Sequence, residues 1–188
     1  MNKYLILVKH SVPEIVESAP AREWKLSEPG QARATRLAEQ LKQYQPEVII
    51  CSKEPKAKET AEIIAAIHLI ELRVAEDLHE HDRSNVPYLP RDEFQASVYE
   101  FFQKPRELVF GKETADQAHA RFYRGVHSLL RAHTNKTVVI VSHGTVISLF
   151  VSRLTGSSDF EIWNMLGLPS FIAMDLHSNT LIVRSSID

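Results

Sequence analysis

Residues 4–10 read Tyr-Leu-Ile-Leu-Val-Lys-His, an apolar run that ends in a lysine and a histidine. Short apolar runs bounded by polar residues are typical of buried strands. Residues 137–144 repeat the arrangement as Thr-Val-Val-Ile-Val-Ser-His-Gly. We therefore expect His10 and His143 to emerge where two strands end, which is where ligands bind in an open α/β sheet.

Each of these two histidines has a neighbour that favours an anion. Lys9 places a positive charge beside His10, and Gly144 opens a turn into a helix beside His143. Helix N-termini offer free N–H groups and partial positive charge. The sequence therefore predicts an anion site between the two strand ends.

Strand and helix patterns alternate along the rest of the chain. Proline is tolerated in a helical first turn, and Thr114 and Gln117 have the spacing of a capping box. Alternation of this kind favours a mostly parallel sheet covered on both faces. Ser178-Asn179 is expected to form a hairpin turn between the last two strands. The predicted strands are residues 4–8, 48–51, 72–74, 137–142, 171–176 and 181–184, and the predicted helices are residues 32–41, 55–65, 115–132 and 145–154.

At 188 residues the chain has the length of a single domain, residues 1–188. One interruption, residues 84–111, holds three prolines amid a group of aromatic side chains. Long segments of this kind form lids over sites or pack as an irregular flank. We expect a lid insertion here and keep the flank as its alternative.

Composition excludes some classes of partner. The net charge of -2, with 24% charged residues, leaves no electrostatic footprint for nucleic acid or an anionic membrane. No apolar stretch approaches the roughly 20 residues of a membrane span. The lone Cys51 excludes an intramolecular disulfide and is expected to be a buried strand-end residue. A cytoplasmic protein without nucleic-acid or membrane partners is the expectation.

Ordered motifs over nearly the whole chain resemble those of the histidine phosphatase superfamily, which has the phosphoglycerate mutase-like fold. That family carries Arg-His-Gly after its first strand, Ser-Ser-Pro-Leu-x-Arg-Ala-x-Gln-Thr-Ala after its second, and a later Ser-His-Gly. The resemblance implies a three-layer α/β/α sandwich. The matching stretches are residues 7–11, Leu-Val-Lys-His-Ser; residues 24–32, Trp-Lys-Leu-Ser-Glu-Pro-Gly-Gln-Ala; residues 51–61, Cys-Ser-Lys-Glu-Pro-Lys-Ala-Lys-Glu-Thr-Ala; residues 78–80, Leu-His-Glu; residues 111–114, Gly-Lys-Glu-Thr; and residues 142–144, Ser-His-Gly.

The resemblance implies a phosphomonoesterase that uses no metal or cofactor and has His10, Glu80 and His143 as catalytic residues. His10 would take the phosphoryl group as a phosphohistidine. This requires an unprotonated attacking nitrogen, with the other nitrogen bonded to a backbone carbonyl. Glu80 would protonate the leaving oxygen and later activate water, which requires a pKa raised toward neutrality.

Further residues are implied around the phosphate. Lys9 and Lys56 would neutralise the phosphoryl oxygens together with His143. Ser11 and Gly144 would line the phosphate pocket. Arg83, near Glu80 and at the edge of the lid segment, is a candidate from its position to bind another part of the substrate. The substrate itself is expected to be a small-molecule or protein phosphate ester.

Departures from the family pattern leave alternatives open. Lys9 and Lys56 replace both motif arginines and cannot make the bidentate fork to phosphate, and Ser11 replaces a glycine. A noncatalytic phosphoryl-binding module and a phosphomutase therefore stay as alternatives. Asp82 is the alternative to Glu80 as the acid. A metal-dependent phosphoesterase would use His79, Glu80, His81, Asp82 and His143.

Overall fold

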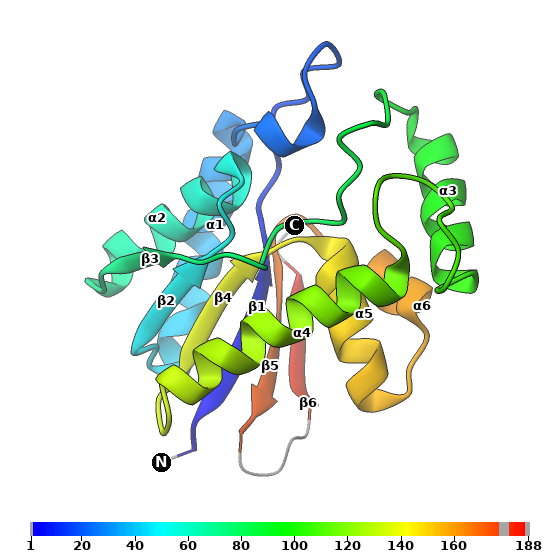
Figure 1. The fold of residues 1–188 in the computed structure, drawn as a ribbon. Helices are drawn as coiled ribbons and strands as arrows, with labels where there is room; N and C mark the ends of the chain where they lie inside the picture. The colour runs from blue at the N-terminus through cyan, green and yellow to red at the C-terminus, as the bar shows by residue number, and fades with distance from the viewer. Residues whose placement is uncertain (1, 177–180, 187–188) are drawn as a thin grey trace.

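The computed structural model describes residues 2–176 and 181–186, and a six-stranded sheet lies at its centre, in the order β3-β2-β4-β1-β5-β6 (Figure 1). Strands β1 to β4 are parallel, whereas β5 is antiparallel to β1 and to β6. The predicted mostly parallel sheet is confirmed. The strands are β1 (Tyr4–Lys9), β2 (Val48–Cys51), β3 (Leu72–Val74), β4 (Val138–Ser142), β5 (Ser170–Asp175) and β6 (Leu181–Ser186).

Helices cover both faces of this sheet, with α1 and α2 on one face and α4, α5 and α6 on the other (Figure 1). The three-layer α/β/α sandwich is therefore confirmed. The helices are α1 (Glu28–Leu41), α2 (Pro55–His68), α3 (Arg91–Gln103), α4 (Ala115–Ala132), α5 (Gly144–Thr155) and α6 (Asp159–Met165), with short 3-10 helices at Ala21–Glu23 and Lys42–Tyr44.

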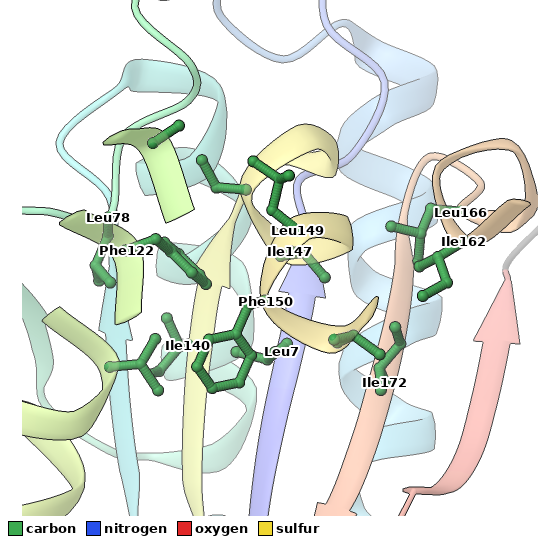
Figure 2. Close-up of a cluster of buried hydrophobic side chains, with 14 of the residues drawn as sticks. Leu7, Leu78, Phe122, Ile140, Ile147, Leu149, Phe150, Ile162, Leu166 and Ile172 are labelled. Carbon is green, nitrogen blue, oxygen red and sulfur yellow. The ribbon is translucent and has the colours of Figure 1, made fainter. Parts of the chain in front are cut away.

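Strand β1 is buried on both sides, because successive side chains of a strand point to opposite faces. Leu7 belongs to the cluster under α4 and α5, and Ile6 belongs to the cluster under α1 and α2. Figure 2 shows the first cluster, where Phe122 of α4 and Phe150 of α5 lie over strand residues that include Leu7. Each fully buried side chain of this size contributes about 1.5–3 kcal/mol. This burial on both faces fixes the position of β1, so that His10 at its carboxyl end is held beside His143 at the carboxyl end of β4.

Local capping sets the helix starts. Ser27 Oγ accepts from the Gly30 N–H at 3.1 Å, so α1 begins before the predicted residue 32. The predicted capping box of α4 is confirmed, since the Thr114 hydroxyl accepts from the Gln117 N–H and the Gln117 side chain accepts from the Thr114 N–H. The predicted hairpin turn at Ser178-Asn179 lies outside the described residues.

The interruption at residues 84–111 contains helix α3, which the sequence reading did not predict. Val98 and Phe101 of this helix are fully buried, and α3 packs against α6. Flanking prolines and a cluster of aromatics obscured the helical spacing of these side chains, and the seven-residue α6 is too short to show a period. The aromatics thus supply packing, and a lid function of the segment stays a prediction.

Across residues 2–176 and 181–186, no helix combines the length and apolar character that crossing a membrane requires.

Candidate active site

Three parallel strands end at one edge of the sheet and bring the predicted site residues together there. His10 follows β1, Ser52 follows β2 and His143 follows β4. The His10 N–H donates to Ser142 O at 3.0 Å, and the Ser52 N–H donates to Val141 O at 2.9 Å, so both residues continue the sheet ladder. The rings of His10 and His143 lie 5.2 Å apart between centroids, inclined at 63°.

His10 is held in one tautomer. Its Nδ1 lies 2.8 Å from Ser11 O, and because a carbonyl only accepts, Nδ1 carries the proton and Nε2 keeps its lone pair. Burial, with Lys56 and His143 nearby, holds the pKa of His10 well below its usual value. The ring is therefore neutral at pH 7, and the expected backbone carbonyl partner is confirmed.

The Ser11 side chain serves the scaffold. Its hydroxyl donates to Gly30 O at 2.6 Å, and its N–H donates to Thr60 Oγ1 at 3.0 Å. Both donors of Ser11 are therefore used inside the protein, tying the strand end to α1 and α2. With its proton donated to Gly30 O, the Ser11 hydroxyl has none left to donate to a phosphate, so a role for Ser11 at the phosphate stays a prediction.

Lys9 runs beside the first residue of α5. A Cβ added at Gly144 would lie only 3.1 Å from Lys9 Cε, so glycine makes room for this side chain. Lys9 Nζ donates to Leu166 O at 2.8 Å, which leaves two N–H groups for another acceptor. Burial lowers the pKa of Lys9 to about 8, although the Glu80 carboxylate opposes the shift.

Lys56, in the first turn of α2, is buried and points toward a carboxylate. Its Nζ donates to Glu54 Oε2 at 2.6 Å and to Ala21 O at 2.7 Å. Burial lowers the pKa of Lys56, and the charge and hydrogen bond of Glu54 oppose this. Lys56 therefore stands at the site with one N–H still available.

His143 is fully buried and bound on one side only. Its Nε2 lies 2.9 Å from Ser52 Oγ and 3.5 Å from Glu54 Oε1, whereas its buried Nδ1 has no hydrogen-bond partner. Burial, followed by the charge of Lys56, keeps the pKa of His143 well below its usual value. The unpartnered Nδ1 is a ring atom that can bind a ligand oxygen.

Glu80 is anchored through three backbone contacts. Its own N–H donates to Glu54 Oε1 at 2.8 Å, while its carboxylate accepts from His81 N at 2.9 Å and from Thr145 N, at the start of α5, at 3.2 Å. The last contact places a negative charge at a helix N-terminus.

The expected rise in the pKa of Glu80 is not found. Burial raises the pKa of Glu80, but the positive charge of Arg83, together with His143 and the His81 N–H, lowers it below the usual value. The competing acid, Asp82, instead accepts from the N–H of Ser84 at 3.0 Å, so its carboxylate supports a local turn.

Arg83 is brought toward the site by an aromatic contact. Its guanidinium carbon lies 4.5 Å from the centroid of the Phe94 ring, a cation–π arrangement. Its Nη1 is buried without a hydrogen-bond partner. A buried guanidinium N–H with no acceptor is suited to bind an anionic or polar group.

A cavity of about 220 Å³ lies beside these groups. Its lining is rich in charged side chains of both signs, which suits a small polar ligand. The lining residues are Pro20, Ala21, Arg22, Lys53, Glu54, Lys56, His79, Glu80, His81, Asp82, Arg83 and Ser84.

A comparison with models of known protein families identifies the family to which this chain belongs. Residues 5–185 match the family model of the histidine phosphatase superfamily (branch 1). The chain belongs to the histidine phosphatase superfamily. The resemblance inferred from the motifs is thus confirmed over nearly the whole chain.

Individual histidine phosphatase relatives show moderate similarity. The chain is 27% identical to an uncharacterized phosphatase of Bacillus subtilis, over 70% of this chain and 65% of that protein. It is also 27% identical to a metal-independent phosphoserine phosphatase of Arabidopsis thaliana, over 82% of this chain and 69% of that protein. A solved structure named mycobacterial hydrolase 1 superposes over all of both chains with a TM-score of 0.81 and 20% identity.

Glu54 is a residue of the candidate site that the sequence patterns did not indicate. It stands where the histidine phosphatase motif has leucine, yet its side chain is buried and contacts Lys56, His143 and the Glu80 backbone. A carboxylate at an apolar motif position is the signal that would have found it.

Arg121 of α4 is a second residue that the sequence patterns did not indicate. It holds residues 77–82, here called the acid loop because they carry the carboxyl groups of Glu80 and Asp82. Its guanidinium donates to the carbonyls of Asp77, His79 and Glu80 at 2.9–3.2 Å. It also pairs with Glu113 at 2.6 Å. A helical arginine normally indicates a solvated surface, so its role becomes visible only in the fold.

Hydrogen bonds that Asp82 forms with Glu113 and Lys112 join the two ends of the segment between the acid loop and α4. Glu113 Oε1 accepts from Asp82 N at 3.0 Å, and the Lys112 N–H donates to Asp82 O at 2.6 Å. Gly111 turns the chain with a φ of +85°, and a Cβ there would lie 2.5 Å from Asp82 O. The two ends of residues 83–111 are therefore pinned to each other.

We predict that Arg121→Met lowers the free energy of unfolding by about 3 kcal/mol, because it leaves Glu113 and three carbonyls without their buried partner. The measurement is urea denaturation. Arg124→Met is the matched control, since Arg124 on the same helix pairs with Asp77 at 3.7 Å but is 67% exposed, and its loss should cost at most about 1 kcal/mol. Equal losses in the two variants would contradict a special role for Arg121.

The metal-ligand alternative has no assembled site. Among residues 2–176 and 181–186, no group of three or more His, Cys, Asp or Glu side chains is placed to hold an ion. His81, one of the proposed ligands, is 2% exposed, and its ring packs against Phe101 at 4.2 Å and Phe110 at 4.8 Å between centroids. These contacts assign His81 to packing.

Proposed function

We propose that this chain is a metal-independent phosphomonoesterase that acts through a phosphohistidine on His10. The observation that carries the proposal is the bond from His10 Nδ1 to Ser11 O, because it leaves a neutral ring with a free Nε2 beside cationic groups. Nε2 attacks phosphorus, the phosphorus–oxygen bond to the leaving group breaks, and that oxygen takes a proton. Water then attacks phosphorus, and the phosphorus–nitrogen bond breaks to restore His10.

Glu80 supplies the proton in the first step and removes one from water in the second. Its carboxylate is charged in the free site, where Arg83 lowers its pKa. A phosphate dianion entering beside it places negative charge nearby and so raises that pKa, which favours the protonated acid when substrate is bound. Asp82 is the weaker candidate because its carboxylate supports the turn at Ser84.

The phosphoryl oxygens contact Lys9, Lys56 and His143 Nδ1, which stabilise the charge of the loose transition state. The leaving group lies toward Arg83 and the charged cavity, which favours a small polar phosphate ester over a ring-bearing one. The Arabidopsis relative is named a phosphoserine phosphatase, and phosphoserine is a small polar phosphate ester of this kind.

Trapping of the intermediate tests this proposal. After acid-free quenching of a reaction with an aryl phosphate in EDTA, we expect intact-mass analysis to show one added phosphoryl group, lost on mild acid treatment and absent from His10→Ala.

A noncatalytic phosphoryl-binding module is the second candidate, because Lys9 and Lys56 already have acceptors within the protein. Binding of inorganic phosphate without turnover or a phosphoenzyme would favour that module.

We predict an alkaline decline in activity set by Lys9. Since the pKa of Lys9 is about 8, raising the pH above 8 removes a positive charge from the free site, and kcat/KM for an aryl phosphate should fall. Lys9→Arg keeps the charge at all these pH values and should move the decline to higher pH, where the second buried lysine, Lys56, loses its proton. The measurement is a kcat/KM profile from pH 6 to 10, and an unchanged decline in Lys9→Arg would show that another group causes it.

A further inference from the structure

Glu54 and Lys56 form a buried ion pair at the edge of the phosphoryl site. Lys56 Nζ and Glu54 Oε2 lie 2.6 Å apart, and the two side chains are only 5% and 9% exposed. The other oxygen of Glu54 accepts from the Glu80 N–H at 2.8 Å and lies 3.5 Å from His143 Nε2. The carboxylate is therefore fixed between α2, the acid loop and the end of β4.

Two departures from the histidine phosphatase motif meet in this pair. The motif has leucine and arginine at the positions of Glu54 and Lys56. Arginine keeps its proton in any protein environment, whereas a buried lysine tends to lose it because burial disfavours the ammonium form. A lysine at this position therefore needs a counter-ion that an arginine would not need.

We propose that Glu54 is a positioning residue that keeps Lys56 in its ammonium form and aims it at the phosphoryl group, so that the pair replaces the arginine of the motif. This inference deepens the proposed function and rests on it. Two N–H groups of Lys56 are used by Glu54 and by Ala21 O, which leaves the third to donate to a phosphoryl oxygen.

The other charges around Lys56 favour its ammonium form less than Glu54 does, or oppose it. Glu80 also favours the ammonium form, but its effect ranks below that of Glu54, and Arg83 opposes it. The two site histidines are neutral at pH 7 because burial lowers the pKa of each. The titratable and charged groups that act on Lys56 from the surrounding elements are Glu54, Glu80, Arg83, His10 and His143.

Direct titration of Lys56 tests the counter-ion role without relying on activity. In protein labelled with ¹³Cε-lysine, the Lys56 resonance is assigned by its absence in Lys56→Arg and followed by NMR against pH. Glu54→Gln, which keeps the shape but removes the charge, should lower the titration midpoint of Lys56 by about one pH unit or more. Glu62→Gln is the control, because Glu62 lies on the same helix and pairs with the exposed Lys58 at 3.8 Å. An unchanged midpoint in Glu54→Gln would overturn the proposal.

Kinetics with a rescue variant tests the consequence for the site. In Glu54→Gln, the alkaline decline of kcat/KM should begin at lower pH than in wild type, and adding Lys56→Arg should return it to the decline near pH 8 set by Lys9. A loss that is equal at every pH and unrescued by arginine would instead indicate a structural role and contradict the proposal. A shifted Lys56 midpoint in a protein that hydrolyses no phosphate ester would support the counter-ion role and contradict the proposed function.

Discussion

Replacing His10 by alanine should lower the turnover of an aryl phosphate in EDTA by at least about a thousandfold. The expected loss is this large because no other described group offers a neutral imidazole nitrogen with its second nitrogen bonded to a carbonyl at this strand end. The remaining cationic groups would still bind the phosphoryl group, so binding of inorganic phosphate should persist. The measurement compares kcat of the wild type and the variant, purified side by side.

A matched histidine variant controls for nonspecific damage. His133 ends α4 before β4 begins, at the opposite edge of the sheet from the site, and His133→Ala should change turnover by less than about twofold. Thermal unfolding of both variants checks that each remains folded. Substantial turnover by folded His10→Ala would rule out the phosphohistidine mechanism.

Glu80→Gln should have the second-largest effect, and its size should depend on the leaving group. General acid catalysis contributes about 10²- to 10⁴-fold when a leaving group needs a proton. Hydrolysis of an alkyl phosphate should therefore fall at least about a hundredfold, whereas an aryl phosphate with a good leaving group should lose at most about tenfold. The measurement is kcat for both substrate types.

Asp82→Asn separates the two candidate acids. Because the Asp82 carboxylate accepts from Ser84 N, this variant should lose less alkyl phosphatase activity than Glu80→Gln. Equal losses of Glu80→Gln on alkyl and aryl phosphates would show that Glu80 is not the acid. A larger, leaving-group-dependent loss in Asp82→Asn would move the acid role to Asp82.

The sequence predicted the parts of the site that follow from strand periodicity. His10 and His143 each follow an unbroken apolar run, so their meeting at one sheet edge could be read directly. Lys56 was singled out by its place in the family motif, where it replaces an arginine directly after Pro55. These are local sequence patterns, which can be recognised without knowledge of the fold.

The residues that the sequence did not reveal act over long separations. Arg121 lies more than 40 positions from the carbonyls that it binds. Glu54 contacts residues on the acid loop and after β4, and the charge of such a residue normally indicates a solvated surface. Ser11 shows the converse, since a hydroxyl expected to face the ligand is used by Gly30 O. The hydrogen-bond and ion-pair partners of these side chains are decided by the three-dimensional arrangement, and the spacing of residues along the sequence does not reveal them.

The pinned ends of residues 83–111 have a consequence for how substrate choice can diverge while chemistry is retained. Asp82 and Lys112 are joined by a backbone hydrogen bond, and Glu113 ties that junction to Arg121. Residues 83–111 therefore form a segment whose two ends are fixed, so we expect changes on its exposed side to leave Glu80 in place. If this segment contacts the leaving group, as proposed above, mutations on its exposed side can alter substrate choice, while the buried Val98 and Phe101 restrict changes on its core-facing side.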